Sequence, residues 1–122
     1  MAVKEDKVKR DIMKAFGRVM RLWMCPVGYA WQKASDGTFF RFFYGLAKGN
    51  ADIIGIYPRV ITQADVGKTI GQFVSIEVKR PGAKGELRPD QVIWFNVIRR
   101  FGGLAVVADC VEDVENAIKE AA

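Results

Sequence analysis

The residues best suited to chemistry in this sequence are two carboxylates, a lysine and a glutamine. Asp52 stands at the start of a short apolar segment. Glu77 and Lys79 flank Val78 at the end of another, and Gln91 follows twelve residues after the lysine, where a helix is expected to begin. Carboxylate oxygens are ligands that Mg²⁺ and Mn²⁺ prefer. Water bound to such an ion, beside a lysine, is suited to attack a phosphodiester.

The chain contains no histidine, which narrows the chemistry further. The usual zinc sites and every histidine-based acid–base or nucleophilic mechanism are therefore excluded. Cys25 and Cys110 lie far apart and neither belongs to a CxxC pair, so we expect two free thiols in a reducing compartment. Any catalysis must depend on carboxylates, lysine and a hard metal ion.

Length and composition predict one globular domain over 1–122. Of the 122 residues, 50% are hydrophobic and 27% are charged, a balance typical of a folded rather than a disordered chain. No apolar run approaches the ~18 residues that a membrane span needs, and the charged N-terminal segment is unlike a secretory signal. We therefore expect a cytoplasmic protein. The net charge of +5 favours a polyanionic partner such as nucleic acid.

The hydrophobic pattern predicts the elements that must position these residues. A three- and four-residue apolar repeat indicates a first helix, and Ser35-Asp36-Gly37 is typical of a hairpin turn. Later, Asp109 with Glu112 is typical of a capping box at a helix start. The expected elements are helices over 4–23, 89–101 and 109–120 and strands over 29–33, 39–44, 51–57, 72–79 and 104–108, with a polar connection over 58–71 that carries some structure. This order predicts an α/β fold, with a mixed sheet flanked by helices.

The alternation within 72–79 puts Glu77 and Lys79 on one face of a strand. If this strand pairs antiparallel with 51–57, one register places Asp52 directly opposite Glu77. Paired side chains then have Cβ atoms about 4.5–5.5 Å apart, where two like charges repel. A divalent ion held by both carboxylates would remove that repulsion.

The Glu77-Val78-Lys79 triplet is weak evidence alone, because an E-x-K pattern arises by chance in roughly a third of chains this long. An ordinary exposed Glu/Lys pair is the alternative. The order of motifs carries more information, and it resembles the virus-type replication-repair nuclease (VRR-NUC) family of the PD-(D/E)XK superfamily, in its stand-alone phage or bacterial form. The resemblance covers 45–115 and rests on these segments: Gly49-Asn50-Ala51-Asp52, Glu77-Val78-Lys79, Gln91-Val92-Ile93-Trp94, and Gly102-Gly103 before an apolar strand. Two positions depart from the superfamily's usual pattern: Ala51 stands where proline is common, and Arg88 stands where Ser or Thr is common. Neither position is among the residues expected to take part in the reaction.

The resemblance implies a restriction-endonuclease-like domain and a role for each motif residue. Asp52, Glu77 and the main-chain carbonyl of Val78 would hold Mg²⁺ or Mn²⁺, which lowers the pKa of a bound water. Lys79 would orient or deprotonate that water, or stabilise the pentavalent phosphorus. Gln91 would hold the lysine, a water or a phosphate oxygen. The implied activity is DNA endonuclease on branched DNA, including four-way (Holliday) junctions, by a homodimer.

Many members of the superfamily add an acid from the first helix, and Glu5 is the candidate here. Taking ~100° per residue, Glu5 lies roughly 40° from the centre of the apolar stripe, closer than Asp6 or Asp11. The alternative is a solvated acid that interacts favourably with the helix dipole.

Basic and aromatic residues surround the motifs. Lys33 and Arg41 flank the expected hairpin, whose many aromatic residues exceed what one face can bury, so we expect some to stack on bases or to contact a partner subunit. The residues predicted to contact phosphates near the motifs are Lys48, Arg80, Lys84 and Arg88.

Two other functions stay open from the sequence. A non-catalytic nucleic-acid-binding module would keep the fold but would not need a complete Asp52, Glu77, Lys79 and Gln91 set. A basic α/β scaffold protein would show no DNA association, or one insensitive to salt.

Overall fold

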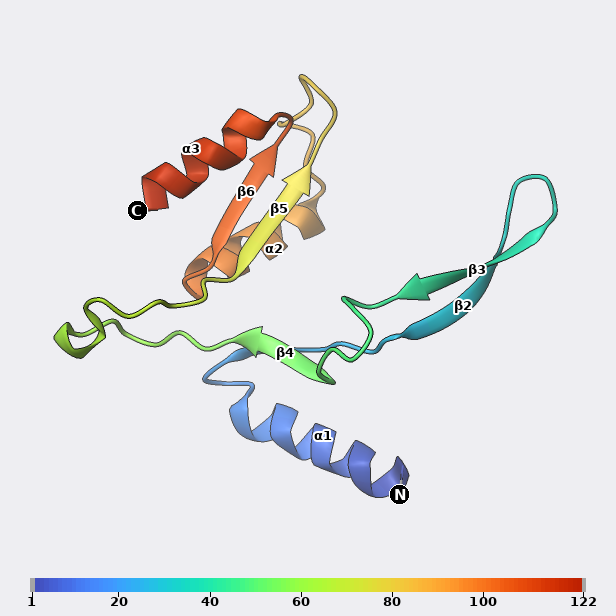
Figure 1. Cartoon of the computed structure of the whole chain (residues 1–122), viewed down its shortest axis with the longest axis horizontal. Coiled ribbons are helices and arrows are strands. Elements are labelled where there is room, and N and C mark those ends of the chain that lie inside the picture. The colour runs from blue at the N-terminus through green and yellow to red at the C-terminus, as the bar shows by residue number, and fades with distance from the viewer. Residues whose placement is uncertain (1, 122) are drawn as a thin grey trace. The chain divides into compact units, whose positions relative to one another are not determined.

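The structure is a computed structural model that describes residues 2–121 (Figure 1). The chain divides into two compact units, Met1–Gly55 and Ile56–Ala122, and each is treated separately below. The elements are α1 (Ala2–Phe16), β1 (Arg21–Met24), β2 (Gly28–Lys33), β3 (Phe39–Tyr44), β4 (Ile53–Ile56), the 3₁₀ turn η1 (Gln63–Asp65), β5 (Val74–Val78), α2 (Pro89–Arg100), β6 (Leu104–Ala108) and α3 (Val111–Ala121). The predicted α/β class is confirmed, while the strands form three two-stranded sheets, β1–β4, β2–β3 and β5–β6, where one mixed sheet was expected.

The first helix is shorter than the apolar repeat predicts. α1 ends at Phe16, and Gly17 follows with its amide donating to the Met13 carbonyl oxygen at 2.9 Å. The chain then turns and enters β1, so the expected helix over 4–23 is wrong beyond Phe16. The apolar, β-branched and aromatic residues over 19–23 suit a strand as well as a helix, because both elements bury such side chains.

β1 pairs with β4 and thereby fixes the backbone at Asp52. The Cys25 amide donates to the Asp52 carbonyl oxygen at 2.8 Å. At the other end of the pair, Gly55 lies so close to Arg21 that a Cβ there would overlap the arginine's carbonyl oxygen. Cys25 therefore faces Asp52 while Arg21 faces Gly55, which makes the two strands antiparallel. Just before Asp52, the Asn50 side chain accepts from two loop amides and donates to the Cys25 carbonyl oxygen at 3.1 Å.

The predicted hairpin over 29–44 is confirmed. β2 and β3 pair antiparallel, with Tyr29 opposite Phe43 and Trp31 opposite Arg41. In the connecting turn, the Asp36 carboxylate accepts from the Thr38 amide at 3.0 Å. These hydrogen bonds define the register and so decide which side chains share a face.

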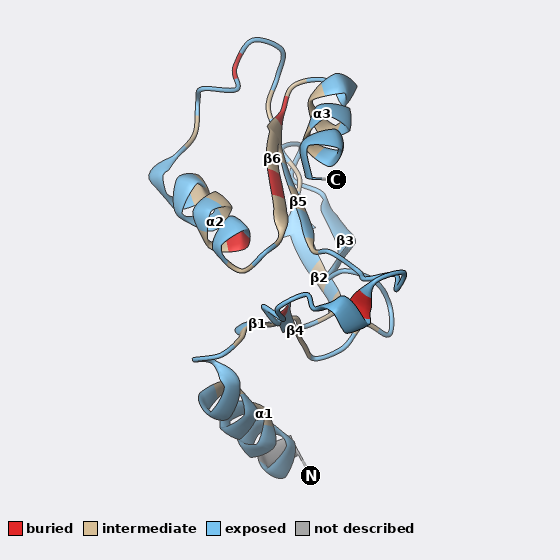
Figure 2. Cartoon of the chain, turned by 90° about the vertical axis from the view of Figure 1, so that its left-hand side faces the viewer, coloured by how far each residue is buried: buried red, intermediate tan, exposed pale blue. Residues whose placement is uncertain are grey.

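The second unit is built on a strand–helix–strand–helix order, β5-α2-β6-α3. β5 and β6 are parallel, with Glu77 opposite Val107, and α2 and α3 lie on either side of this sheet (Figure 2). Ile98 of α2 is fully buried, and Ala105 and Ala108 of β6 are nearly so. α2 begins at Pro89 and ends before Gly102-Gly103, as the sequence predicts.

The polar connection before β5 carries the local structure that was expected. Asp65 at the end of η1 is only 7% exposed, and both of its carboxylate oxygens accept from Arg59 Nη1 at 2.9 Å. The Thr62 amide donates to the same carboxylate and, with Arg59, lowers the pKa of Asp65. Within residues 2–121, no helix combines the length and the apolar character that crossing a membrane requires.

Candidate functional site

Three of the four motif residues meet in the second unit. Gln91 Nε2 donates to Glu77 Oε1 at 2.8 Å, and Lys79 Nζ donates to Gln91 Oε1 at 3.1 Å. Lys79 Nζ also lies 3.7 Å from Glu77 Oε1. Strand alternation puts the acid and the lysine on the face of β5 toward α2, and the first turn of that helix supplies the glutamine. The structure thus brings together Glu77, Lys79 and Gln91 as a closed polar triangle.

The Gln91 side chain is held by the start of α2 as well as by β5. Its Oε1 accepts from the Arg88 amide at 3.0 Å, so the side chain caps a helix start that would otherwise leave that donor unpaired. Arg88 takes the place before Pro89, and its guanidinium pairs with Asp90 at 3.1 Å. Hydrogen bonding to Arg88 lowers the pKa of the Asp90 carboxyl. Helix capping and the polar triangle therefore share one side chain.

A hollow of about 330 Å³ opens beside the triangle, lined by Glu77, Arg88, Asp90, Gln91 and Trp94. Trp94 Nε1 donates to the hydroxyl of Ser75 at 2.8 Å, which ties a second turn of α2 to β5. The side chain of Glu77 is 38% exposed and that of Lys79 only 18%. Among the described residues, Glu77 Oε2 makes no hydrogen bond, so this oxygen is free to bind a cation or water.

Asp52 and Glu5 belong to the first unit, and both carboxylates interact electrostatically with the ammonium group of Lys9. Lys9 Nζ lies 3.3 Å from Glu5 Oε1. The pKa of Lys9 is raised, first by its hydrogen bond with Glu5, and among the charges most by Asp52 and less by Asp6. Glu5 forms an ordinary ion pair one turn along the helix, so its role as the first-helix acid stays a prediction.

In the described residues β4 pairs with β1, and β5 pairs in parallel with β6, so the expected antiparallel pairing of 51–57 with 72–79 is wrong. Each strand found a partner that the hydrophobic pattern does not specify. The register that would place Asp52 opposite Glu77 is therefore absent, and their shared ion stays a prediction.

The basic residues of the loop over 80–88 are each paired with an acid. Arg80 lies 3.4 Å from Glu86, and Lys84 lies 2.9 Å from Asp113. Lys48 lies in an exposed loop before Asp52. Their predicted contacts with phosphates stay predictions, and for Lys84 and Arg88 the ion pairs supply a structural role in addition.

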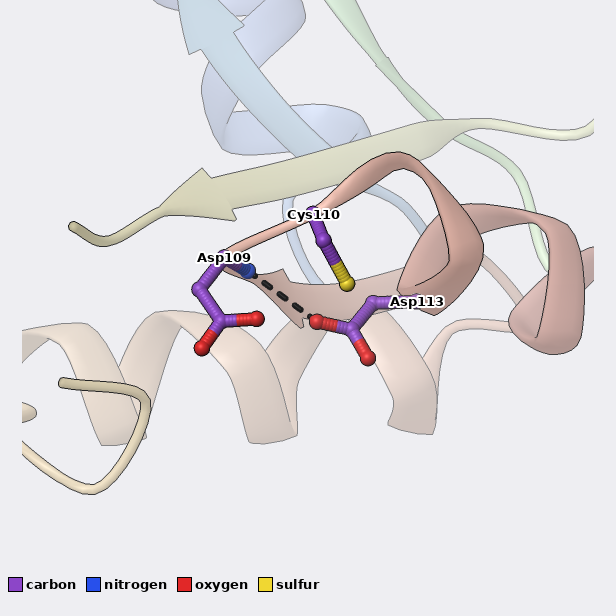
Figure 3. A group of neighbouring side chains, drawn as sticks. All are labelled: Asp109, Cys110 and Asp113. Atoms are coloured by element: carbon purple, nitrogen blue, oxygen red, sulfur yellow. Dashed lines mark hydrogen bonds between the residues drawn. The ribbon is translucent and has the colours of Figure 1, made fainter. Parts of the chain in front are cut away.

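A second cluster, Asp109, Cys110 and Asp113 at the start of α3, was not anticipated from the sequence (Figure 3). Their potential ligand atoms lie within 4.8 Å of one another. Asp113 Oδ2 accepts from the Asp109 amide at 3.0 Å, so Asp113, rather than the expected Glu112, closes this helix start. The sequence did contain a signal for this cluster, namely two aspartates, Asp109 and Asp113, spaced by four residues at an expected helix start.

Hydrogen bonds within the chain already engage most of this cluster. Asp113 Oδ1 accepts from Lys84 Nζ at 2.9 Å, and Asp109 Oδ2 accepts from the Gly82 amide at 3.0 Å. Backbone and lysine donors lower the pKa of Asp113, and the same ion pair raises the pKa of Lys84. Three of the four carboxylate oxygens in the cluster therefore accept hydrogen bonds, and Lys84 balances part of its charge. The cluster fits a structural role, in which it holds the 80–88 loop against α3, better than it fits a metal site.

Comparisons of the chain with protein-family models, with curated proteins and with solved structures found no match.

Proposed function

We propose that this protein is a Mg²⁺- or Mn²⁺-dependent endonuclease that hydrolyses DNA phosphodiester bonds. The observation that carries the proposal is the Glu77–Gln91–Lys79 triangle, in which one glutamine contacts both the acid and the lysine. A chance E-x-K pair on a strand does not require such a partner. The Gln91–Lys79 contact supports the proposal, because the resemblance to VRR-NUC nucleases implies a glutamine that holds the lysine.

The donor set suits a hard divalent ion. Glu77 has one oxygen fastened by Gln91 and the other without a hydrogen bond among residues 2–121, at the edge of an open hollow. The motif order adds Asp52, the Val78 carbonyl and Glu5 as further candidate ligands, all of them oxygen donors of the kind that Mg²⁺ and Mn²⁺ prefer. When bound, the ion supplies a water of lowered pKa and neutralises charge on the scissile phosphate.

The chain's own residues then orient the reactants. Lys79 Nζ is held by Gln91 and by the nearby Glu77 carboxylate, so its remaining protons can point toward a water or a phosphate oxygen. Its positive charge stabilises the negative charge that develops on the phosphorus oxygens. Gln91 acts as a positioning residue, because it fixes the acid and the lysine relative to each other before substrate arrives.

Substrate shape, assembly and location belong to the same proposal. We infer a preference for branched DNA such as four-way junctions, as the motif order implies, and an intracellular site of action on nucleic acid. Each chain holds one Asp52, Glu77, Lys79 and Gln91 set, so cutting two strands symmetrically calls for two copies, and a homodimer supplies them.

The experiment that tests the activity compares wild type with Lys79→Ala on labelled junction, flap and linear DNA, with Mg²⁺, Mn²⁺ or EDTA. Lys119→Ala, which removes an exposed lysine from α3, is the matched control. We expect wild type and Lys119→Ala to cut only with metal, and Lys79→Ala to be inactive. Equal cutting by both lysine variants, or cutting in EDTA, refutes the proposal. Metal-independent DNA binding without any cutting would instead favour the non-catalytic binding module.

A further inference from the structure

The two faces of the β2–β3 hairpin differ in charge. Strand alternation and the register put one set of side chains on each face. The first face carries Tyr29, Trp31, Lys33, Phe39, Arg41 and Phe43, and is called the cationic aromatic face below. The opposite face carries Ala30, Gln32, Phe40, Phe42 and Tyr44 and has no charged residue.

Aromatic rings and cations are interleaved on the cationic aromatic face. The Arg41 guanidinium carbon lies 4.3 Å from the centre of the Tyr29 ring, and Tyr29 meets Phe43 edge to face at 5.6 Å. Trp31 lies directly opposite Arg41 and is 68% exposed. An arginine stacked on a ring keeps its outer N–H groups free for hydrogen bonds.

The charge on this face has no compensation within the hairpin. The one acidic residue of the hairpin, Asp36, lies in the turn, where its carboxylate accepts from the amide and the hydroxyl of Thr38. Those hydrogen bonds lower the pKa of Asp36. Neither Lys33 nor Arg41 has a carboxylate partner in the part of the chain that the structure describes. The face therefore presents two cations and several rings to solvent.

We propose that the cationic aromatic face binds single-stranded nucleic acid, with bases stacked on Trp31 and neighbouring rings and phosphates held by Lys33 and Arg41. Aromatic platforms between cations are the general way in which proteins bind unpaired strands, because every base has a face that stacks. An apolar protein partner, such as the uncharged opposite face of a second copy, fits this face poorly, since it would bury two cations without a carboxylate to pair them. The uncharged opposite face has no such cost.

This inference rests on the proposed function for its link to cleavage. Junctions and flaps expose unpaired or easily unpaired bases at the branch point, whereas uninterrupted duplex does not. A surface that binds unpaired bases therefore gives a nuclease a means of selecting branched DNA.

The test measures binding in EDTA, so that no strand is cut. Fluorescence anisotropy with a short labelled oligothymidine and with the matching duplex is recorded for wild type, Trp31→Ala, Trp31→Phe and Phe42→Ala. Losing one stacked base weakens binding by about 5- to 150-fold, so we expect at least a fivefold loss for Trp31→Ala on the single strand. Trp31→Phe should restore most of the affinity, and Phe42→Ala on the opposite face should leave it unchanged. Circular dichroism verifies that each variant is folded.

Salt dependence supplies a second, independent readout. Arg41→Gln should reduce the slope of log affinity against log salt by about 0.7, the value for one phosphate contact on a single strand. Equal losses for Trp31→Ala and Phe42→Ala, or unchanged affinity in Trp31→Ala, would overturn the proposal. Loss of self-association in Trp31→Ala with intact DNA binding would assign the face to a protein contact instead. Because cleavage is not measured, an inactive protein that binds through Trp31 would refute the nuclease but not this inference.

Discussion

Replacing Gln91 by alanine removes the side chain that connects the acid, the lysine and the start of α2. Three hydrogen bonds are lost, to Glu77 Oε1, from Lys79 Nζ and from the Arg88 amide. The first two involve charged groups, for which one hydrogen bond contributes about 1.5–3 kcal/mol. Glu77 is 38% exposed and Lys79 18% exposed, so water compensates part of that contribution.

The expected loss in the reaction is therefore about 2 kcal/mol in total, or roughly 30-fold in rate. The bond to the Arg88 amide affects the helix start, and its loss should lower the free energy of unfolding by about 1 kcal/mol. The variant should remain folded while its reaction slows, because the lost contacts position reacting groups rather than fill the core.

Single-turnover cleavage of labelled junction DNA at saturating Mg²⁺ measures this loss. Gln72→Ala is the matched control, because that glutamine makes one exposed hydrogen bond, to the Gly102 carbonyl oxygen. Gln91→Glu keeps an acceptor for Lys79 but loses the donor to Glu77, so it separates the two contacts. A Gln91→Ala rate within about threefold of wild type, a difference under 1 kcal/mol, would refute the assigned role.

Three further predictions concern stability and the second acidic cluster. Ile98→Ala should lower the free energy of unfolding by about 3 kcal/mol, because the side chain is 0% exposed. Urea denaturation measures this loss, and a much smaller value would contradict a packed core in the second unit. The folded-state pKa values of Asp65 and Asp113 are lowered, so the stability they contribute is complete above the unfolded value of about 4 and is lost as pH falls below it. Asp65→Asn should therefore flatten the stability profile between about pH 5 and 2, and an unchanged profile would contradict this cause. Asp113→Asn should lower stability but leave the Mg²⁺ dependence of cleavage unaltered, whereas a raised Mg²⁺ requirement would assign the ion to that cluster.

Local signals were sufficient to predict the helices and strands of the second unit, though not the parallel pairing of β5 with β6. The apolar run over 104–108 lies between Gly102-Gly103 and an acid, and it forms β6 with the expected bounds. Pro89 marks the start of α2 as expected. The alternation in β5 puts Glu77 and Lys79 on one face, so the triangle with Gln91 follows from local pattern and motif order together.

Features that depend on distant residues were not predictable in the same way. Because residues 19–23 fit both a helix and a strand, β1 could not be predicted from the sequence, and neither could its pairing with β4. The Asp109–Asp113 cluster depends on Lys84, which lies 29 residues from Asp113 along the chain. Hydrophobic periodicity carries no information about such pairs.

The central proposal is that Asp52 and Glu77 both serve one metal-dependent cleavage reaction. A double-mutant cycle on the cleavage rate tests it most directly, with Asp52→Asn, Glu77→Gln and the combined variant assayed at fixed Mg²⁺ on the same junction. Residues that act as a unit give non-additive losses. We predict that each single change lowers the rate by nearly as much as the double change. Losses that multiply, or an Asp52→Asn variant that cuts like wild type, would contradict the account.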